Sequence, residues 1–297
     1  MPTDMLDKQI DKHLVRASFN RAAQHYDEAA VLQREVGNNM LERLDDIRMQ
    51  PATILDVGAG TGFCATALSE RYPKANIILL DLAPAMLQHA RQKRNWREKL
   101  FSRRQSYLCA DAETLPLADN SVDMLFSNLT LQWCEDLAGT FAEFQRVLKP
   151  DGMLLFSSFG PDTLKELRHS WHSVDANVHV HRFLDMHDVG DALLYSGFAD
   201  PVMDVERYTL TYPDVYQLMR ELKALGAHNA AYHRPHALTG RNKLKAMIGA
   251  YEQYRANGVL PASYEVVFGH AWAPRQPRAA SCSSINVQLQ PTLPGVK

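Results

Sequence analysis

The 297-residue chain is nearly neutral, with 32 Lys and Arg against 34 Asp and Glu, so its overall charge does not indicate a nucleic-acid-binding protein. No apolar run approaches the ~20 residues that cross a bilayer, and the polar N-terminus does not resemble a signal peptide. Four cysteines without a C-x-x-C pair indicate buried thiols in a reducing cytosol, with neither disulfides nor zinc. We therefore expect a cytoplasmic protein that binds neither nucleic acid nor membrane.

Residues 1–48 precede the first predicted strand and are expected to be helical. Apolar side chains recur at helical spacing in two runs, which Tyr26-Asp27 is expected to interrupt. We interpret 1–48 as an N-terminal helical lid, in which Tyr26 closes over cofactor and substrate. A purely structural role for Tyr26, as a packing aromatic, is the alternative.

A glycine-rich turn follows the first predicted strand. The apolar run from Thr53 predicts a buried parallel strand, and Phe63–Arg71 is predicted to be the next helix. Between them, Gly58, Gly60 and Gly62 let the backbone turn tightly and approach a ligand closely. This turn predicts a ligand site at the carboxyl end of the first strand.

Two further strands end in acids and make the turn more informative. Ile77–Asp81 lies about one βαβ unit downstream, where a ribose diol would be held, and residues 107–113 form the third strand. A dinucleotide fingerprint would need Gly or Ala where Phe63 stands, and nothing basic nearby would neutralise a pyrophosphate. Asp56 instead suits a ligand with an ammonium group. The arrangement resembles class I S-adenosylmethionine (SAM) methyltransferases.

The cofactor site can be assigned residue by residue. Asp81 is expected to accept hydrogen bonds from both ribose hydroxyls. Leu82 and Met86 would pack on the adenine, and Asp111 and Ala112 would meet its edge, although Asp111 could instead be a strand-end turn residue. The expected cofactor-binding residues are Asp56, Gly58, Gly60, Gly62, Asp81, Leu82, Met86, Asp111, Ala112 and Asn128.

Strands and helices alternate through the predicted methyltransferase domain, 49–273, which favours a parallel sheet with right-handed crossovers. The fold class is α/β, a Rossmann-like, mostly parallel seven-stranded sheet. Helical insertions at about 161–183 and 213–258 are interpreted as a cap over the cleft. The tail, 274–297, is rich in Pro and Ser and expected to be disordered. The later elements are strands at 122–127, 153–159, 202–212 and 264–272, and helices at 137–148, 163–174, 188–196, 213–225 and 239–256.

The loop after the fourth strand, Ser127–Cys134, is expected to face the reacting methyl group, because ligands bind beyond the carboxyl ends of parallel strands. Asn128 is followed by Leu-Thr-Leu, which lacks the aromatic platform for a flipped base. Gln132 and Trp133 are expected to line the pocket, although Trp133 could equally be core.

Charged and imidazole side chains of the insertions give the remaining candidates. Arg168 could hold a carboxylate bidentately, with a solvated helix arginine as the alternative and Arg182 as a weaker candidate. His179 and His181 alternate, but no further metal ligands are evident, so no metal is expected. Two basic segments could dock an acidic partner. They are the run 91–104 and the cap residues Arg234, Arg241, Lys243 and Lys245.

Several motifs together carry a family resemblance over residues 17 to 273. They include Phe19-Asn-Arg-Ala-Ala-Gln-His-Tyr26, Gln132-Trp-Cys134, Thr163-Leu-Lys-Glu-Leu-Arg168 and Leu222-Lys-Ala-Leu-Gly-Ala227. The chain resembles the malonyl-[acyl-carrier protein] O-methyltransferases of biotin synthesis, although Gly-Ala-Gly-Thr-Gly stands where relatives often have Gly-Cys-Gly.

The resemblance implies methyl transfer from SAM to the free carboxylate of malonyl-acyl-carrier protein, or malonyl-CoA. The expected catalytic residues are Arg168, Tyr26, Gln132 and Trp133. Two alternatives stay open. One is a complex-I assembly factor of the arginine-hydroxylating type, which shares some of the motifs, and the other is a noncatalytic SAM-binding assembly protein.

Overall fold

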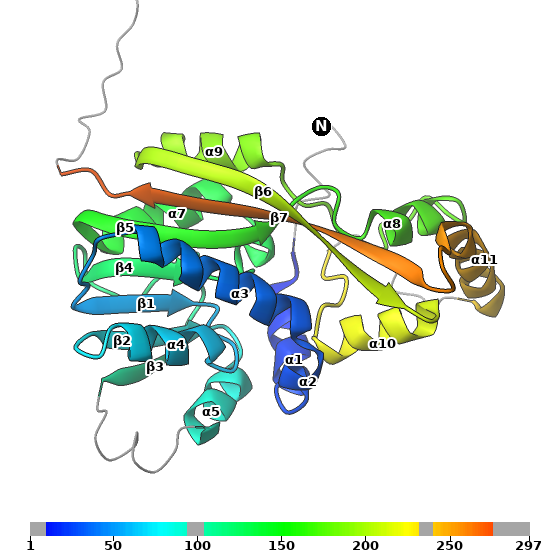
Figure 1. The fold of residues 1–297 in the computed structure, drawn as a ribbon, viewed down its shortest axis with the longest axis horizontal. Helices are drawn as coiled ribbons and strands as arrows, with labels where there is room; N and C mark the ends of the chain where they lie inside the picture. The colour runs from blue at the N-terminus through cyan, green and yellow to red at the C-terminus, as the bar shows by residue number, and fades with distance from the viewer. Residues whose placement is uncertain (1–9, 94–103, 232–239, 276–297) are drawn as a thin grey trace, which may run out of the picture.

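A seven-stranded sheet organises the fold of the computed structural model, which describes residues 10–93, 104–231 and 240–275. The strands lie in the order β3-β2-β1-β4-β5-β7-β6 (Figure 1). Strands β1 to β5 pair in parallel, whereas β7 runs antiparallel to both β5 and β6. The expected mostly parallel sheet is therefore confirmed. The strands are β1 (Thr53–Val57), β2 (Asn76–Asp81), β3 (Gln105–Cys109), β4 (Val122–Ser127), β5 (Leu148–Phe159), β6 (Ala199–Tyr212) and β7 (Leu260–Trp272).

Helices cover both faces of the sheet because the central strand β1 is apolar on both sides. Side chains alternate between the two faces along a strand. Ile54 accordingly packs with Met40 and Leu68 on one face, and Leu55 packs with Phe141 on the other. An uninterrupted apolar run thus becomes a strand enclosed by two helical layers. The first layer includes α3 (Val31–Arg43) and α4 (Phe63–Arg71), and the second includes α7 (Leu137–Val147) and α9 (Met186–Tyr195).

The N-terminal segment forms the helices α1 (Lys12–Ala22), α2 (Tyr26–Ala29) and α3. Asp11 begins α1 as an N-cap, its side chain accepting a hydrogen bond from the Leu14 amide at 3.0 Å. The prediction that Tyr26-Asp27 interrupts the helical run was wrong by a few residues. The break is a turn at residues 23–25, and Tyr26 is the first residue of α2.

Several predicted element ends differ from the observed ones. The third strand stops at Cys109, so Asp111 lies in the turn beyond it and not in the strand. β5 begins at Leu148, earlier than expected, because Leu148 already pairs with Val122 of β4 before a register shift. The helix predicted from Thr163 begins two residues later as α8 (Lys165–His172), because Leu164 has a left-handed backbone with φ of 53°.

The antiparallel β6–β7 pair is long and runs from Ala199–Trp272 to Tyr212–Leu260. It extends past the other strands, and α8, α10 (Val215–Ala224) and α11 (Arg241–Tyr251) gather at its far end (Figure 1). Of the predicted tail, 276–297 lies outside the described residues. Within the described ranges, no helix is long and apolar enough to cross a membrane.

Candidate active site

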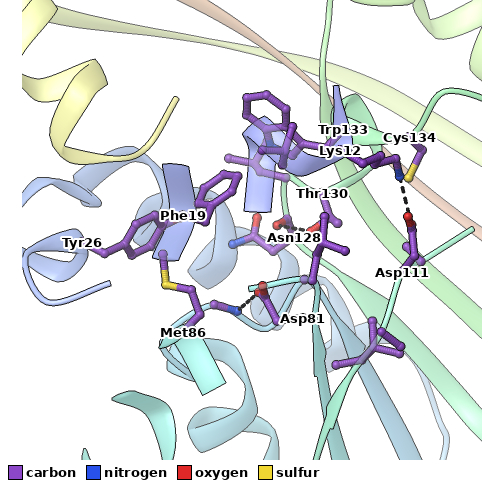
Figure 2. Close-up of a pocket in the computed structure, with 18 residues that line it drawn as sticks. Lys12, Phe19, Tyr26, Asp81, Met86, Asp111, Asn128, Thr130, Trp133 and Cys134 are labelled. Carbon is purple, nitrogen blue, oxygen red and sulfur yellow. Dashed lines mark hydrogen bonds and ion pairs between the residues drawn. The ribbon is translucent and has the colours of Figure 1, made fainter. Parts of the chain in front are cut away.

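A cavity of about 650 Å³ opens beyond the carboxyl ends of β1, β2 and β4 (Figure 2). It is the position at which open parallel sheets bind ligands. α1 and α2 contribute Lys12, Phe19 and Tyr26 to its walls. We refer to it as the first cavity. Among the expected cofactor-binding residues, it brings together Gly58, Gly60, Asp81, Leu82, Met86, Asp111, Ala112 and Asn128.

The glycine turn forms the floor of the first cavity. Gly58 has φ of +70°, and a Cβ added there would lie 1.9 Å from Oγ1 of Thr130. The backbone conformation and the contact therefore both require glycine. Gly62, with φ of +82°, is the N-cap of α4 and lies behind the cavity, where an added Cβ would be 3.1 Å from Ala90.

Asp81 ends β2 with its carboxylate fixed by the backbone. One oxygen accepts a hydrogen bond from the Gly60 amide at 2.9 Å, and the other accepts one from the Ala83 amide at 2.7 Å. Burial nevertheless raises the pKa of Asp81 to about 6. Each carboxylate oxygen can accept a second hydrogen bond, so the orientation suits a vicinal diol.

Asp56 is almost fully buried, and its Oδ2 has no hydrogen-bond partner. Burial, and then the nearby Asp81, raise the pKa of Asp56 to about 7. Asp56 lines a hollow of about 450 Å³ that shares Tyr26, Gly58 and Asn128 with the first cavity. An unpaired buried carboxylate is costly unless a cation compensates it. The hollow therefore suits the ammonium end of an amino-acid ligand.

Lys12 pairs with Asp111 at 2.9 Å (Figure 2) and also with Glu113. These two ion pairs join α1 to the turn after β3. No sequence pattern indicates this contact, because a single lysine near a helix start has no distinguishing spacing. Asn128 is similarly engaged. Its amide donates to the Gln33 carbonyl at 2.9 Å and accepts from Ser157 at 2.9 Å, joining α3 to β5.

A second cavity, of about 720 Å³, lies between the sheet edge and the helical insertions. Trp133 lines both this cavity and the first one, so the two cavities lie on either side of this residue or next to it. The ring packs against Phe19 and His181, with centroids 5.4 and 5.3 Å away. Gln132 also lines the second cavity. The walls are otherwise mostly apolar, which suits an acyl group.

Three residues that line the second cavity each have a buried polar atom without a partner: Oε1 of Gln33, Oε1 of Gln132 and Nε2 of His181. Burial, followed by the charge of Arg168, lowers the pKa of His181 to about 4, so the ring is neutral at pH 7. In the sequence, the alternation of His179 and His181 indicates at most a metal site, and no pattern marks His181 as a residue of this cavity. Its neighbour His179 has a structural role, because it stacks on Trp171 at 3.8 Å and contacts Asp175 at 2.9 Å.

Arg168 lies on α8, but its guanidinium is already engaged with the backbone. Its two terminal nitrogens donate to the carbonyls of Pro161 and Thr163, both at 2.7 Å, while Nε is buried without a partner. Arg168 lines neither the first nor the second cavity. A free guanidinium fork facing the cleft, as the sequence suggested, is therefore not its arrangement here.

Comparisons with known proteins agree with this geometry. A methyltransferase domain family matches residues 55–156. The malonyl-[acyl-carrier protein] O-methyltransferase of Gallionella capsiferriformans is 53% identical over 266 residues, covering 89% of this chain and 92% of that protein. The chain belongs to this family. The family member from Methylovorus sp. is 51% identical and covers 95% of this chain and 96% of its own.

The fold is also found in solved structures at low sequence identity. The YcgJ protein from Bacillus subtilis superimposes with a TM-score of 0.56 and 17% identity, covering 80% of this chain and 100% of that one. Likeness at this identity shows the fold alone, because a fold does not fix a function. The family assignment of the malonyl-[acyl-carrier protein] O-methyltransferases rests instead on the close relatives.

Proposed function

We propose that the chain transfers the methyl group of SAM to the free carboxylate of a malonyl group carried by an acyl-carrier protein. The methyl ester would prime the acyl chain of biotin synthesis in the cytosol. The observation that carries the proposal is that two cavities share Trp133 as a lining residue. One has carboxylates placed for a charged nucleoside, and the other is an apolar chamber for an acyl group.

SAM supplies an electrophilic methyl group on a sulfonium. In the proposal, Asp81 accepts the ribose hydroxyls, and Asp56 holds the ammonium in its hollow. Leu82 and Met86 pack on the adenine, with Asp111 and Ala112 at its edge. Tyr26 lines both parts of this site, and its burial raises its pKa, which keeps the phenol protonated. Tyr26 would therefore act by packing and hydrogen bonding, with no part in proton abstraction.

The reacting carboxylate needs no general base, because it is already ionised at pH 7. Its oxygen attacks the methyl carbon, the sulfur–methyl bond breaks, and both charges are neutralised. The aromatic wall of Trp133, Phe19 and His181 excludes water from this point, and a dry site favours a step in which charge disappears.

His181 is proposed to position the malonyl carboxylate, and Gln132, whose unpartnered Oε1 can only accept a hydrogen bond, is proposed to contact the arm that carries it. A neutral imidazole can donate one hydrogen bond from Nε2 to the carboxylate. An ion pair would hold the carboxylate more strongly but would reduce the nucleophilicity of its oxygen. Arg168 is proposed to contribute its positive charge near His181 and to fix the turn at residues 161–163. Direct contact between Arg168 and the carboxylate would require it to release the Pro161 or Thr163 carbonyl.

The helices around the two cavities are proposed to form a lid and a cap. The N-terminal helices supply Lys12, Phe19 and Tyr26 to the first cavity. The two insertions supply Leu167 and Leu222 to the second. In the proposal, these helices hold the reacting atoms together and keep water out. Catalysis then rests on positioning, because the reaction needs no general base.

Transfer of label from methyl-labelled SAM to purified malonyl-carrier protein tests the proposal. We expect a base-labile methyl ester on the malonyl carrier and no label on the carrier without malonyl. Binding of SAM without transfer to the carrier would favour the noncatalytic reading. Hydroxylation of an arginine substrate, without transfer of the labelled methyl group, would favour an arginine-hydroxylating assembly factor.

A further inference from the structure

The turn after α10 packs directly against α1 at the edge of the second cavity. Gly226 has φ of +72°, and a Cβ added there would lie 3.2 Å from Ala22 Cβ and 3.2 Å from the Ser18 carbonyl oxygen. The Gly226 amide donates to the Lys223 carbonyl at 3.1 Å. The next residues, including His228, line the second cavity. The last turns of α1 and α10 therefore meet beside that cavity, in agreement with the positions of the two helices in Figure 1.

Each of these two turns carries an exposed cation, Arg21 on α1 and Lys223 on α10. Arg21 donates only to the Ser18 hydroxyl, at 3.3 Å, and neither cation forms an ion pair with a described residue. Burial, and then Arg21 and Lys223 together, lower the pKa of the His228 ring between them. Two cations thus converge on the cavity edge without a carboxylate to neutralise them. We call Arg21 and Lys223 the rim cations.

The basic residues of α11 offer a weaker surface. Lys243 is already paired with Asp175 at 2.8 Å, and the second cavity has no lining residue from α11. In Figure 1, α11 lies at the far end of the β6–β7 pair, away from α1 and α2. Most of the 91–104 run, and Arg234, lie outside the described residues. Arg168 and Arg182 also lie near the acyl chamber, beside His181, but the guanidinium of Arg168 is held by two backbone carbonyls. The rim cations are exposed and form no ion pair with a described residue, so they are the pair at its edge that we consider for a partner.

We propose that the rim cations form the docking surface for the acyl-carrier protein, with the prosthetic arm entering the second cavity past His228. This inference rests on the proposed function and adds the surface that receives its partner. Carrier proteins of this class are strongly acidic, so unpaired cations beside the entrance attract and orient them. The surface also accounts for recognition by a chain whose overall charge is nearly neutral.

The test is a double charge reversal, Arg21→Glu with Lys223→Glu, in the full chain. Steady-state methylation is measured with malonyl-carrier protein and with malonyl-pantetheine, the arm without the protein, over a range of salt. We expect KM for the malonyl carrier to rise at least about fivefold at low salt and its salt dependence to flatten. Turnover of malonyl-pantetheine and SAM affinity should stay within about twofold of wild type, because both depend on the cavities alone.

The matched control is Arg241→Glu with Lys245→Glu on α11, which makes the same change in net charge. A larger carrier-specific defect in this control than in the rim variant would overturn the docking surface. An equal loss with malonyl-pantetheine would overturn it too, since the rim would then act on the arm. A second readout is inhibition of malonyl-carrier methylation by carrier protein that lacks the prosthetic arm. If this protein inhibits the rim variant as strongly as the wild type, the proposal is contradicted. Failure of the wild-type chain to methylate the carrier at all would instead remove the proposed function.

Discussion

The buried carboxylate of Asp56 should make cofactor affinity depend on pH, and the change can be calculated. Its pKa is raised to about 7 by burial, while an ammonium ligand binds the ionised form. The ionised fraction of the free protein falls from about one half at pH 7 to about one in eleven at pH 6. The titration of Asp56 alone should therefore lower affinity about fivefold, or about 1 kcal/mol, as pH drops by that one unit.

Isothermal calorimetry with S-adenosylhomocysteine measures this change, because that ligand keeps the ammonium group and cannot react. In Asp56→Asn, affinity at pH 7 should be weaker by about 1.5–3 kcal/mol, since a charged hydrogen-bond partner is lost. Its pH dependence should shrink to the share of Asp81, whose pKa is about 6 and which changes affinity at most about twofold over this interval. An Asn variant that keeps the full fivefold change would refute the reasoning, because the titrating group would then lie elsewhere.

Three further substitutions separate the two cavities. Asp81→Ala removes the acceptor held by Gly60 and Ala83 and should weaken SAM binding by about 1–3 kcal/mol in calorimetry; unchanged affinity in a folded variant would exclude Asp81 from the site. His181→Phe keeps the aromatic packing and should raise KM for the malonyl carrier several-fold with SAM affinity intact, so an unaltered KM would return His181 to a packing role. Arg168→Ala should lower both the melting temperature and carrier methylation, because it frees two backbone carbonyls. Arg168→Lys should restore only part of each, since an ammonium lacks the planar fork, and full rescue would argue against that geometry.

The fold was predictable because its signals are local. Each central strand is an apolar run followed by an acid or a glycine turn, and burial on both faces needs no other information. The helix after the glycine turn was predicted with its observed bounds, Phe63–Arg71. The start of β5 was missed because Leu148 joins the sheet through pairing with β4, while its own sequence, Leu-Lys-Pro-Asp-Gly, resembles a turn.

The site was predictable only where a residue's role follows from its place on a strand. Asp56 and Asp81 end apolar runs, so topology alone brings them together. Lys12 and His181 reach the cavities from helices and loops remote in sequence, and no spacing marks them. The Pro161 and Thr163 carbonyls accept hydrogen bonds from Arg168 because the chain turns through a left-handed residue, Leu164. No sequence pattern predicts that turn.

The position of α1 has a consequence for the order in which ligands bind. This one helix supplies Lys12 and Phe19 to the first cavity and carries Arg21 at its other end. A nucleoside that holds α1 in place through the first cavity also fixes the rim cation in position. Linkage requires that each ligand raise the affinity for the other by the same factor. The loaded enzyme should therefore capture the carrier more tightly than the empty one, so that a prosthetic arm is engaged mainly when a methyl group is ready for it.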